Sequence, residues 1–179
     1  MEPLRGCVVP TPIGNLAVVV SPHGVVETTF LDEGEDDREA IARIAEQRGA
    51  PLRPGARALS ALAKEVQGYF GGRVRTFTTP PDLSWLSPGF PRRVLEVTAT
   101  IPYGELWTYG DVAAMAGGAR AGRAAGNALG RCPMELFVPC HRVVHAGGSI
   151  GGYGRHEDRK RWLIRLEREP DAGDGRTRG

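Results

Sequence analysis

Long apolar runs are missing from this 179-residue chain. No stretch approaches the ~18 consecutive apolar residues that a membrane-spanning helix needs. The first five residues also lack the basic start and apolar stretch of a secretory signal peptide. We therefore expect a soluble, intracellular protein without membrane contacts. Because 41% of its residues are hydrophobic, the chain can still bury a substantial core.

Cysteine is scarce, and its pattern is unlike that of a disulfide framework or a structural zinc site. Cys7, Cys132 and Cys140 are odd in number and widely spaced, with no C-x-x-C pair and no histidines at ligand spacing. We therefore expect at least one free thiol, and the sequence gives no support for a metal.

Charge is unevenly distributed along the chain, although the net charge is only +2. Residues 1–87 contain 9 Lys and Arg against 11 Asp and Glu, whereas residues 88–169 contain 12 against 8. The basic second half suits an anionic partner, but basic surfaces are commonly just solvated.

The first part of the chain predicts a small α/β domain, which we assign to residues 1–80. Short apolar runs separated by turn residues predict an antiparallel sheet over residues 7–30. Apolar residues at helical spacing predict helices over residues 36–47 and 56–70. The proline-rich stretch 78–84 is typical of a linker.

The second part, residues 85–169, predicts a mostly helical domain, followed by a flexible tail over 170–179. The expected helices cover residues 91–100, 109–115, 120–129 and 157–169, and Thr108 is the expected N-cap of the second. The middle two are joined by a tight glycine turn and are typical of a helix-turn-helix, whose second helix usually enters a DNA groove. The predicted fold class is therefore α+β.

The helix over 120–129 has almost no long side chains except that of Arg123. Glycine costs a helix roughly 1 kcal/mol relative to alanine, so Gly122 and Gly126 indicate a close approach. Either the helix packs closely on a neighbouring helix, or it enters a groove with one arginine projecting from it.

The segment Val138–Val144 sets Cys140 beside His141 on a short apolar stretch entered through proline. A thiol becomes a strong nucleophile as the thiolate, and an adjacent base can generate one near neutral pH. The segment therefore predicts a reactive centre.

Residues 88–169 resemble the catalytic domain of O6-alkylguanine-DNA alkyltransferases, also called methylated-DNA–protein-cysteine methyltransferases. The matching pieces are Phe90-Pro91, Ile101–Glu105, Tyr109, Ala121–Ala124, Pro139–Val143, Gly152-Tyr153, Arg159-Lys160, Trp162-Leu163 and Glu167. They follow the family's order and spacing over about 80 residues, and P-C-H-R-V is highly specific. The first domain matches more weakly, through Thr11–Gly14 and Tyr69–Gly72.

The resemblance implies a DNA repair enzyme that restores O6-alkylguanine directly, with O4-alkylthymine as a second candidate lesion. Cys140 would take the alkyl group in one irreversible in-line displacement, without a cofactor. His141 would draw the thiol proton through a water, and Glu167 would orient the imidazole. Tyr109 would donate a proton to the base, which relieves O6 of negative charge during the transfer. Its side chain would also crowd the phosphate of the target nucleotide.

The same resemblance implies binding of double-stranded DNA through the minor groove with base flipping. Arg123 would fill the place that the base vacates. The expected DNA-binding residues are Ala121, Gly122, Arg123, Ala124, Asn127 and Tyr109. The expected pocket residues are Val143, Tyr153, Gly154 and Arg155, with the carbonyls of Cys140 and Val143 accepting from the base amine and the Gly154 amide facing O6. A monomeric, cytoplasmic protein with access to chromosomal DNA is implied.

Two positions depart from the family pattern. Cys132-Pro133 stands where members commonly have Asn-Pro. Because a thiol is a weak donor and acceptor, we expect a looser or differently braced hinge. Arg155 stands where glycine is common, and we expect it to narrow the pocket and to slow reaction with benzyl-type lesions.

Three other functions compete with alkyl transfer. An alkyltransferase-like protein that only recognises lesions would lack the nucleophilic cysteine, which is present here. A helix-turn-helix transcription regulator would ordinarily have a longer polar recognition helix and a dimerisation element. A cysteine hydrolase would need an oxyanion motif, and none is apparent in the sequence.

Overall fold

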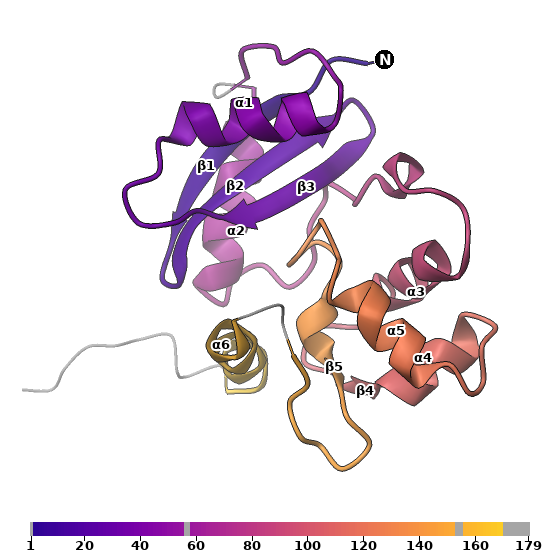
Figure 1. The fold of residues 1–179 in the computed structure, drawn as a ribbon. Helices are drawn as coiled ribbons and strands as arrows, with labels where there is room; N and C mark the ends of the chain where they lie inside the picture. Colours follow the sequence, from indigo (N-terminus) through magenta and orange to yellow (C-terminus); the bar gives the residue numbers. More distant parts are fainter. Residues whose placement is uncertain (1, 56–57, 153–155, 170–179) are drawn as a thin grey trace, which may run out of the picture.

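The computed structural model describes residues 2–55, 58–152 and 156–169 (Figure 1). Its elements are, in chain order, β1 (Arg5–Thr11), β2 (Gly14–Ser21), β3 (Gly24–Phe30), α1 (Asp37–Gln47), α2 (Ser60–Phe70), η1 (Leu83–Trp85), α3 (Phe90–Thr98), β4 (Trp107–Thr108), α4 (Tyr109–Met115), α5 (Gly122–Leu129), η2 (Cys140–Arg142), β5 (Val143–Val144) and α6 (Glu157–Arg168). The fold class is α+β, as predicted. The tail predicted over 170–179 lies outside the described residues.

The three-stranded antiparallel sheet has the order β1-β2-β3, with a helix on each face (Figure 1). Successive side chains of a strand point to opposite faces, so the central strand β2 serves two cores. Leu16 and Val18 pack in the same cluster as Val66 of α2, whereas Ala17 and Val19 pack in the cluster of α1. This double burial explains why β2 is a continuous apolar run in the sequence.

The proline-rich stretch expected as a linker is bound to the edge of the sheet. The backbone of Val25 exchanges hydrogen bonds with the Pro80 carbonyl (2.9 Å) and the Asp82 amide (2.7 Å). The buried Asp82 carboxylate accepts from the Ser21 hydroxyl at 2.6 Å. Gly24, at φ +155°, has no room for a Cβ atom against the carbonyl group of Pro80. The stretch therefore runs along β3 and leads into η1.

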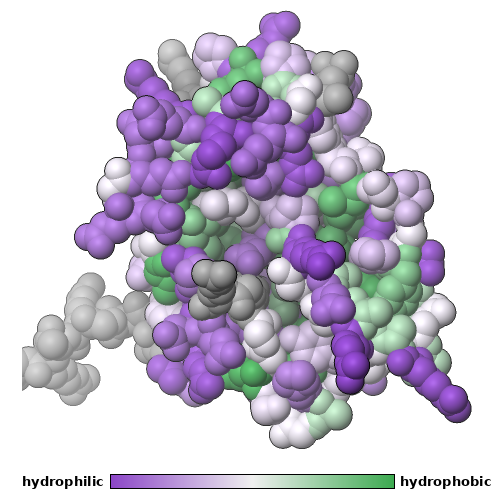
Figure 2. Space-filling model, in the orientation of Figure 1, coloured by the Kyte–Doolittle hydropathy of each residue, from purple (hydrophilic) through white to green (hydrophobic). Residues whose placement is uncertain are grey.

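The helices α3, α4 and α5 pack against one another. Thr108 caps α4 as predicted, in a capping box: its hydroxyl accepts from the Asp111 amide, and the Asp111 carboxylate accepts from the Thr108 amide. The helix boundaries coincide with the prediction or differ from it by one to four residues. The helix predicted from 120 begins at Gly122, after a non-helical Ala121 that provides no side-chain cap. Figure 2 shows a weakly hydrophobic surface over α3 and α5 and a hydrophilic one over α1.

The two parts of the chain share one core. A continuous cluster of buried side chains includes Val18 and Val66 from the first part and Val112 and Leu163 from the second. Thr28 of β3 also bonds the loop that precedes η2, through the Pro133 and Glu135 carbonyls at 2.7 and 2.8 Å. No helix within the described ranges is long and apolar enough to cross a membrane.

Candidate active site

Cys140 opens the short 3-10 helix η2. Pro139 precedes it, and the Pro139 carbonyl closes the turn by accepting from the Arg142 amide at 2.9 Å. Cys140 and the two residues after it are all buried. The chain then enters β5, which pairs in parallel with β4, and β4 leads directly into Tyr109. This unpredicted pairing holds the first turn of α4 beside the reactive segment.

Glu167 of α6 is the centre of a buried hydrogen-bond network. Its Oε1 accepts from the Tyr69 hydroxyl (2.6 Å), His141 Nε2 (2.7 Å) and Arg142 Nη2 (2.9 Å). Its Oε2 accepts from Arg142 Nε (2.9 Å) and the Gly104 amide (3.0 Å). Burial by itself raises the pKa of this carboxyl, but bonds from His141 and Arg142 outweigh it and hold the pKa of Glu167 well below its usual range. Glu167 is therefore an ionised carboxylate held in place by these hydrogen bonds, and it is not a solvated surface charge.

His141 is fully buried and is held in one tautomer. Because Glu167 is an ionised acceptor, the shared hydrogen lies on Nε2 of the imidazole. Burial lowers the pKa of His141, the charges of Arg142 and Lys160 lower it further, and Glu167 opposes this. The ring is therefore neutral at neutral pH. Its Nδ1 is buried and has no hydrogen-bond partner among the described residues, so it is available as a proton acceptor.

The Cys140 thiol is protonated at rest. Burial raises the pKa of Cys140 well above its usual range, the neighbouring Cys132 and Glu135 raise it further, and Lys160 lowers it. Such a cysteine becomes a nucleophile only when a base removes its proton. The next residue in the chain, His141, supplies a base with a free nitrogen.

Lys160 of α6 is a fully buried ammonium. Its Nζ donates to the Val143 carbonyl at 2.5 Å and to the Tyr109 hydroxyl at 3.3 Å. Burial lowers the pKa of Lys160 to about 8, although a thiolate at Cys140 would act in the opposite direction. Lys160 is thus mostly charged at neutral pH, and it fixes a pocket carbonyl and the tyrosine hydroxyl in place.

A groove of about 700 Å³ opens between α4, α5 and the loop after β5. It is lined by Tyr109, Gly110, Gly122, Arg123, Gly126, Asn127, Gly130, His145, Ala146 and Gly152. A Cβ atom at Gly122 or Gly126 would lie 3.7 to 3.9 Å from Tyr109 and Gly110, which are ordinary contact distances. Packing against α4 therefore does not require these glycines, and they leave the groove wide.

The predicted DNA-binding residues do not all meet in this groove. Tyr109, Gly122, Arg123 and Asn127 line it, and Arg123 is exposed. Ala124 instead lines a separate hollow of about 460 Å³ beside α3, which Asn127 also reaches.

Ala121 is the half-buried residue that precedes α5.

Of the predicted pocket residues, Val143 is buried beside the cysteine. Tyr153, Gly154 and Arg155 lie outside the described residues.

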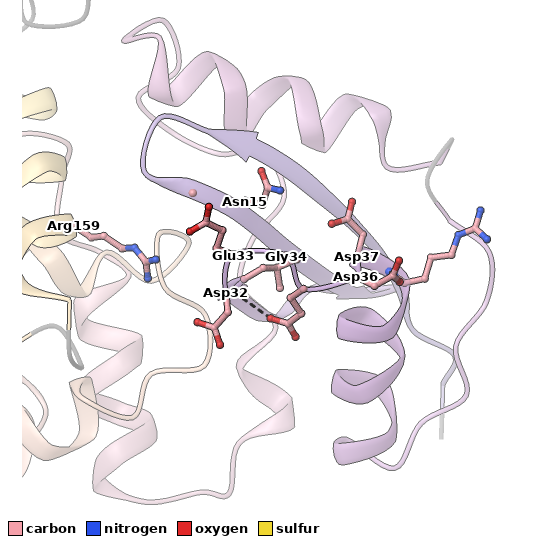
Figure 3. Close-up of a pocket in the computed structure, with 11 residues that line it drawn as sticks. Asn15, Asp32, Glu33, Gly34, Asp36, Asp37 and Arg159 are labelled. Carbon is pink, nitrogen blue, oxygen red and sulfur yellow. Dashed lines mark hydrogen bonds between the residues drawn. The ribbon is translucent and has the colours of Figure 1, made fainter.

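A third hollow, of about 840 Å³, lies between β2, α1 and Arg159 of α6 (Figure 3). It is rich in carboxylates, but several of these already serve the local fold. Asp36 caps α1 by accepting from the amides of Arg38 and Glu39, and Glu35 pairs with Arg43. None of the residues that line this hollow belongs to the network around Glu167. Within the described ranges, no cluster of His, Cys, Asp and Glu could hold a metal ion.

Sequence reasoning gave no role in the chemistry to two members of the site. Tyr69 was expected as part of the apolar face of a helix and of the weaker Tyr69–Gly72 match, and Lys160 as part of the Arg159-Lys160 match on the last helix. A tyrosine on a buried face gives one weak signal, because its hydroxyl then needs a partner. The partner, Glu167, is 98 residues away in the sequence, and no local pattern identifies it.

The chain is similar to known proteins in sequence and in fold. Residues 89–169 match the family model described as 6-O-methylguanine DNA methyltransferase, DNA binding domain. A methylated-DNA–protein-cysteine methyltransferase from Mycolicibacterium paratuberculosis is 39% identical over 84% of this chain and 90% of its own. A DNA base-flipping protein from Thermus thermophilus is 37% identical over 88% of this chain and 96% of its own. The crystal structure of Mycobacterium tuberculosis OGT in complex with DNA has a TM-score of 0.74 and 32% identity, covering 93% of this chain and 92% of that one.

Proposed function

The chain belongs to the O6-methylguanine-DNA methyltransferase family, and on this premise we propose that Cys140 is the residue that takes the alkyl group. The protein is a methylated-DNA–protein-cysteine methyltransferase that repairs DNA by transferring an alkyl group to its own cysteine. The observation that carries the assignment is the neutral His141, with its Nδ1 unpartnered among the described residues, directly after a buried thiol.

In the proposed reaction, the Cys140 proton passes through one water to Nδ1 of His141. The resulting imidazolium is stabilised by the Glu167 carboxylate at 2.7 Å. The thiolate attacks the alkyl carbon of O6-alkylguanine, so that the S–C bond forms as the C–O6 bond breaks. The electron pair of the broken bond stays with guanine, and the base takes a proton from Tyr109. Tyr109 regains a proton and His141 releases one, which leaves guanine and an S-alkyl cysteine.

The geometry around Tyr109 suits proton donation. Burial raises the pKa of Tyr109, so the phenol holds its proton at rest, and a thiolate at Cys140 would raise that pKa further. The Lys160 ammonium, 3.3 Å from the hydroxyl, would stabilise the phenolate that forms during transfer. The thioether on Cys140 is stable, which accounts for a single turnover per molecule. No step needs a cofactor.

For DNA binding, we propose that α4 and α5 act as a helix-turn-helix whose second helix enters the minor groove. The support is the lack of bulky side chains on α5, where Gly122 and Gly126 line the groove beside an exposed Arg123. Arg123 would fill the place of the flipped nucleotide, which suits recognition of a lesion in any sequence. Residues 1–80 and 85–169 form the proposed domains of a monomeric, cytoplasmic protein, and Arg155 remains the proposed rim of the pocket.

The test is the intact mass of the protein after incubation with DNA containing O6-methylguanine. We expect a gain of one methylene mass per molecule and no further turnover. Cys140→Ala should abolish the gain. Cys7→Ala is the matched control, because that buried β1 thiol lies outside the site, and it should keep the adduct. An adduct that survives in Cys140→Ala would refute the assignment, and lesion binding without any adduct would indicate a recognition protein instead.

A further inference from the structure

Tyr69 brings a hydroxyl group from the first part of the chain into the catalytic network. It lies near the end of α2, separated by 72 residues from His141 and by 98 from Glu167. Its side chain is 1% exposed. The hydroxyl donates to Glu167 Oε1 at 2.6 Å and lies 3.3 Å from His141 Nε2. Both contacts of this polar atom are therefore with the pair that would deprotonate the cysteine.

The hydroxyl is not needed to fill space. The Tyr69 ring packs among Phe70, Phe77 and Tyr103, with centroid separations of 5.4, 5.4 and 6.0 Å. A phenylalanine would make the same ring contacts. Since the ring is held by apolar neighbours, it presents the hydroxyl to Glu167 in one fixed orientation.

The shared oxygen explains what the hydroxyl does. Oε1 of Glu167 accepts from Tyr69, His141 Nε2 and Arg142 Nη2, whereas Arg142 Nε and the Gly104 amide bond Oε2. A donor on Oε1 draws negative charge away from the bond to the imidazole. It also prevents the carboxylate from turning away from Nε2. The hydroxyl therefore acts on the direction and on the strength of the His141–Glu167 bond.

We propose that Tyr69 is a positioning residue for alkyl transfer, which holds Glu167 so that His141 keeps its hydrogen on Nε2 and its Nδ1 free for the thiol proton. This inference rests on the proposed function of Cys140 and His141. It also gives the first part of the chain a defined part in the chemistry.

The proposal predicts a change in pH dependence. The groups that face His141 are Glu167 and Lys160 from α6, Arg142 and Cys140 from η2, and Tyr69 from α2. If the hydroxyl is removed, Oε1 of Glu167 keeps more negative charge for the imidazole, while Lys160, Arg142 and Cys140 are unchanged. The imidazolium becomes harder to deprotonate, so the neutral base that the reaction needs is populated only at higher pH.

The experiment compares Tyr69→Phe with wild-type protein in single-turnover methyl transfer from O6-methylguanine DNA across the acid and neutral range. We expect the midpoint of the acid limb to rise by roughly half to one pH unit. At pH values on the acid limb, this shift lowers the rate of methyl transfer by the variant about three- to tenfold. Tyr103→Phe is the matched control. It removes a hydroxyl from the same aromatic cluster, and among the described residues the one hydrogen bond of that hydroxyl is to the Leu166 carbonyl, at 3.5 Å. Its acid limb should coincide with that of the wild type.

The proposal would be overturned if the acid limbs of Tyr69→Phe and Tyr103→Phe superimposed. It would also be overturned by a pH-independent loss of reaction rate that parallels a loss of melting temperature. Nitrogen-15 spectra of histidine-labelled wild-type protein test it without any variant. We expect His141 in the Nε2–H tautomer, with its Nε2 proton hydrogen-bonded, and an Nδ1–H tautomer would overturn the proposal. These spectra need no substrate. A wild-type protein that forms no adduct would therefore refute the proposed function. The pH titration of His141 in the spectra of wild-type and Tyr69→Phe protein would still decide the role of Tyr69, because the proposal expects the imidazolium of the variant to lose its proton at higher pH.

Discussion

Gly151 and Tyr109 are packed so closely that no side chain fits between them. A Cβ atom at Gly151 would lie 2.8 Å from two ring carbons of Tyr109 and nearer still to its hydroxyl oxygen. The ring cannot easily withdraw, because its hydroxyl accepts from Lys160 and its centroid lies 5.0 Å from that of the His145 ring. We therefore expect Gly151→Ala to displace Tyr109 and to slow methyl transfer by about tenfold, the cost of one lost charge-assisted hydrogen bond in the transition state.

Single-turnover kinetics of Gly151→Ala check this expectation, and the same loop supplies a control. Gly147 is exposed, has no positive φ, and has nothing within 4 Å of the place where a Cβ atom would lie. Gly147→Ala should therefore react like the wild type. Equal rates for the two variants would show that the position of Tyr109 does not limit the reaction.

At the scale of elements, the loop between α5 and η2 determines where the cysteine lies. Cys132 begins this loop and is 9% exposed, with its thiol beside that of Cys140. The loop is otherwise tied by backbone bonds, including Val138 to Met134 at 2.8 Å and Thr28 to Pro133 at 2.7 Å. The Cys132 side chain contributes little to this bracing, because a thiol is a weak hydrogen-bonding group.

We expect Cys132→Asn to raise the melting temperature by about 2–4 °C, because one added hydrogen bond is worth about 1 kcal/mol in a chain of this size. Differential scanning calorimetry measures the change. Cys132→Ala is the control, since it removes the thiol without adding an amide, and it should not raise the melting temperature. A Cys132→Asn variant that melts at or below the wild-type temperature would count against a loosely braced hinge.

The elements that could be predicted are those with local signals. The Thr108 cap, the apolar spacing of α1 and the turn-separated strands of the sheet all depend on residues within one turn or one hairpin. The pairing of β4 with β5 was missed because two-residue strands carry no periodicity and join segments 36 residues apart. The family motif identified His141 and Glu167 from the sequence. The role of the Tyr69 hydroxyl could not be predicted in this way, because its contact with Glu167 forms only in the tertiary fold.

At the scale of the whole molecule, buried ionisable groups make stability depend on pH in two opposite directions. Burial raises the pKa of Glu167, but hydrogen bonds from His141 and Arg142 outweigh this effect and depress the pKa. Glu167 therefore stabilises the folded protein above its unfolded pKa of 4.5, and this stabilisation is lost in acid. The pKa of His141 is lowered by burial, so stability also falls as pH drops below 6.5. Glu135 behaves in the opposite way, since burial raises its pKa to about 7 while Arg159 lowers it.

Glu135→Gln should isolate the part of this pH dependence that a single carboxyl contributes. With its folded pKa raised, the wild-type Glu135 contributes stability that is fully present below 4.5 and is lost as pH rises through about 7. A glutamine does not titrate. We therefore expect the free energy of unfolding of the variant, relative to wild type, to increase by about 1–3 kcal/mol between about pH 5 and about pH 9. Urea unfolding at the two pH values measures it. Any pH-independent effect of the amide on the free energy of unfolding cancels when the two pH values are compared. Glu96→Gln, at an exposed surface pair with Arg92, is the control and should show no such change. A difference that is flat or negative between the two pH values would mean that Glu135 is ionised in the folded protein at little cost.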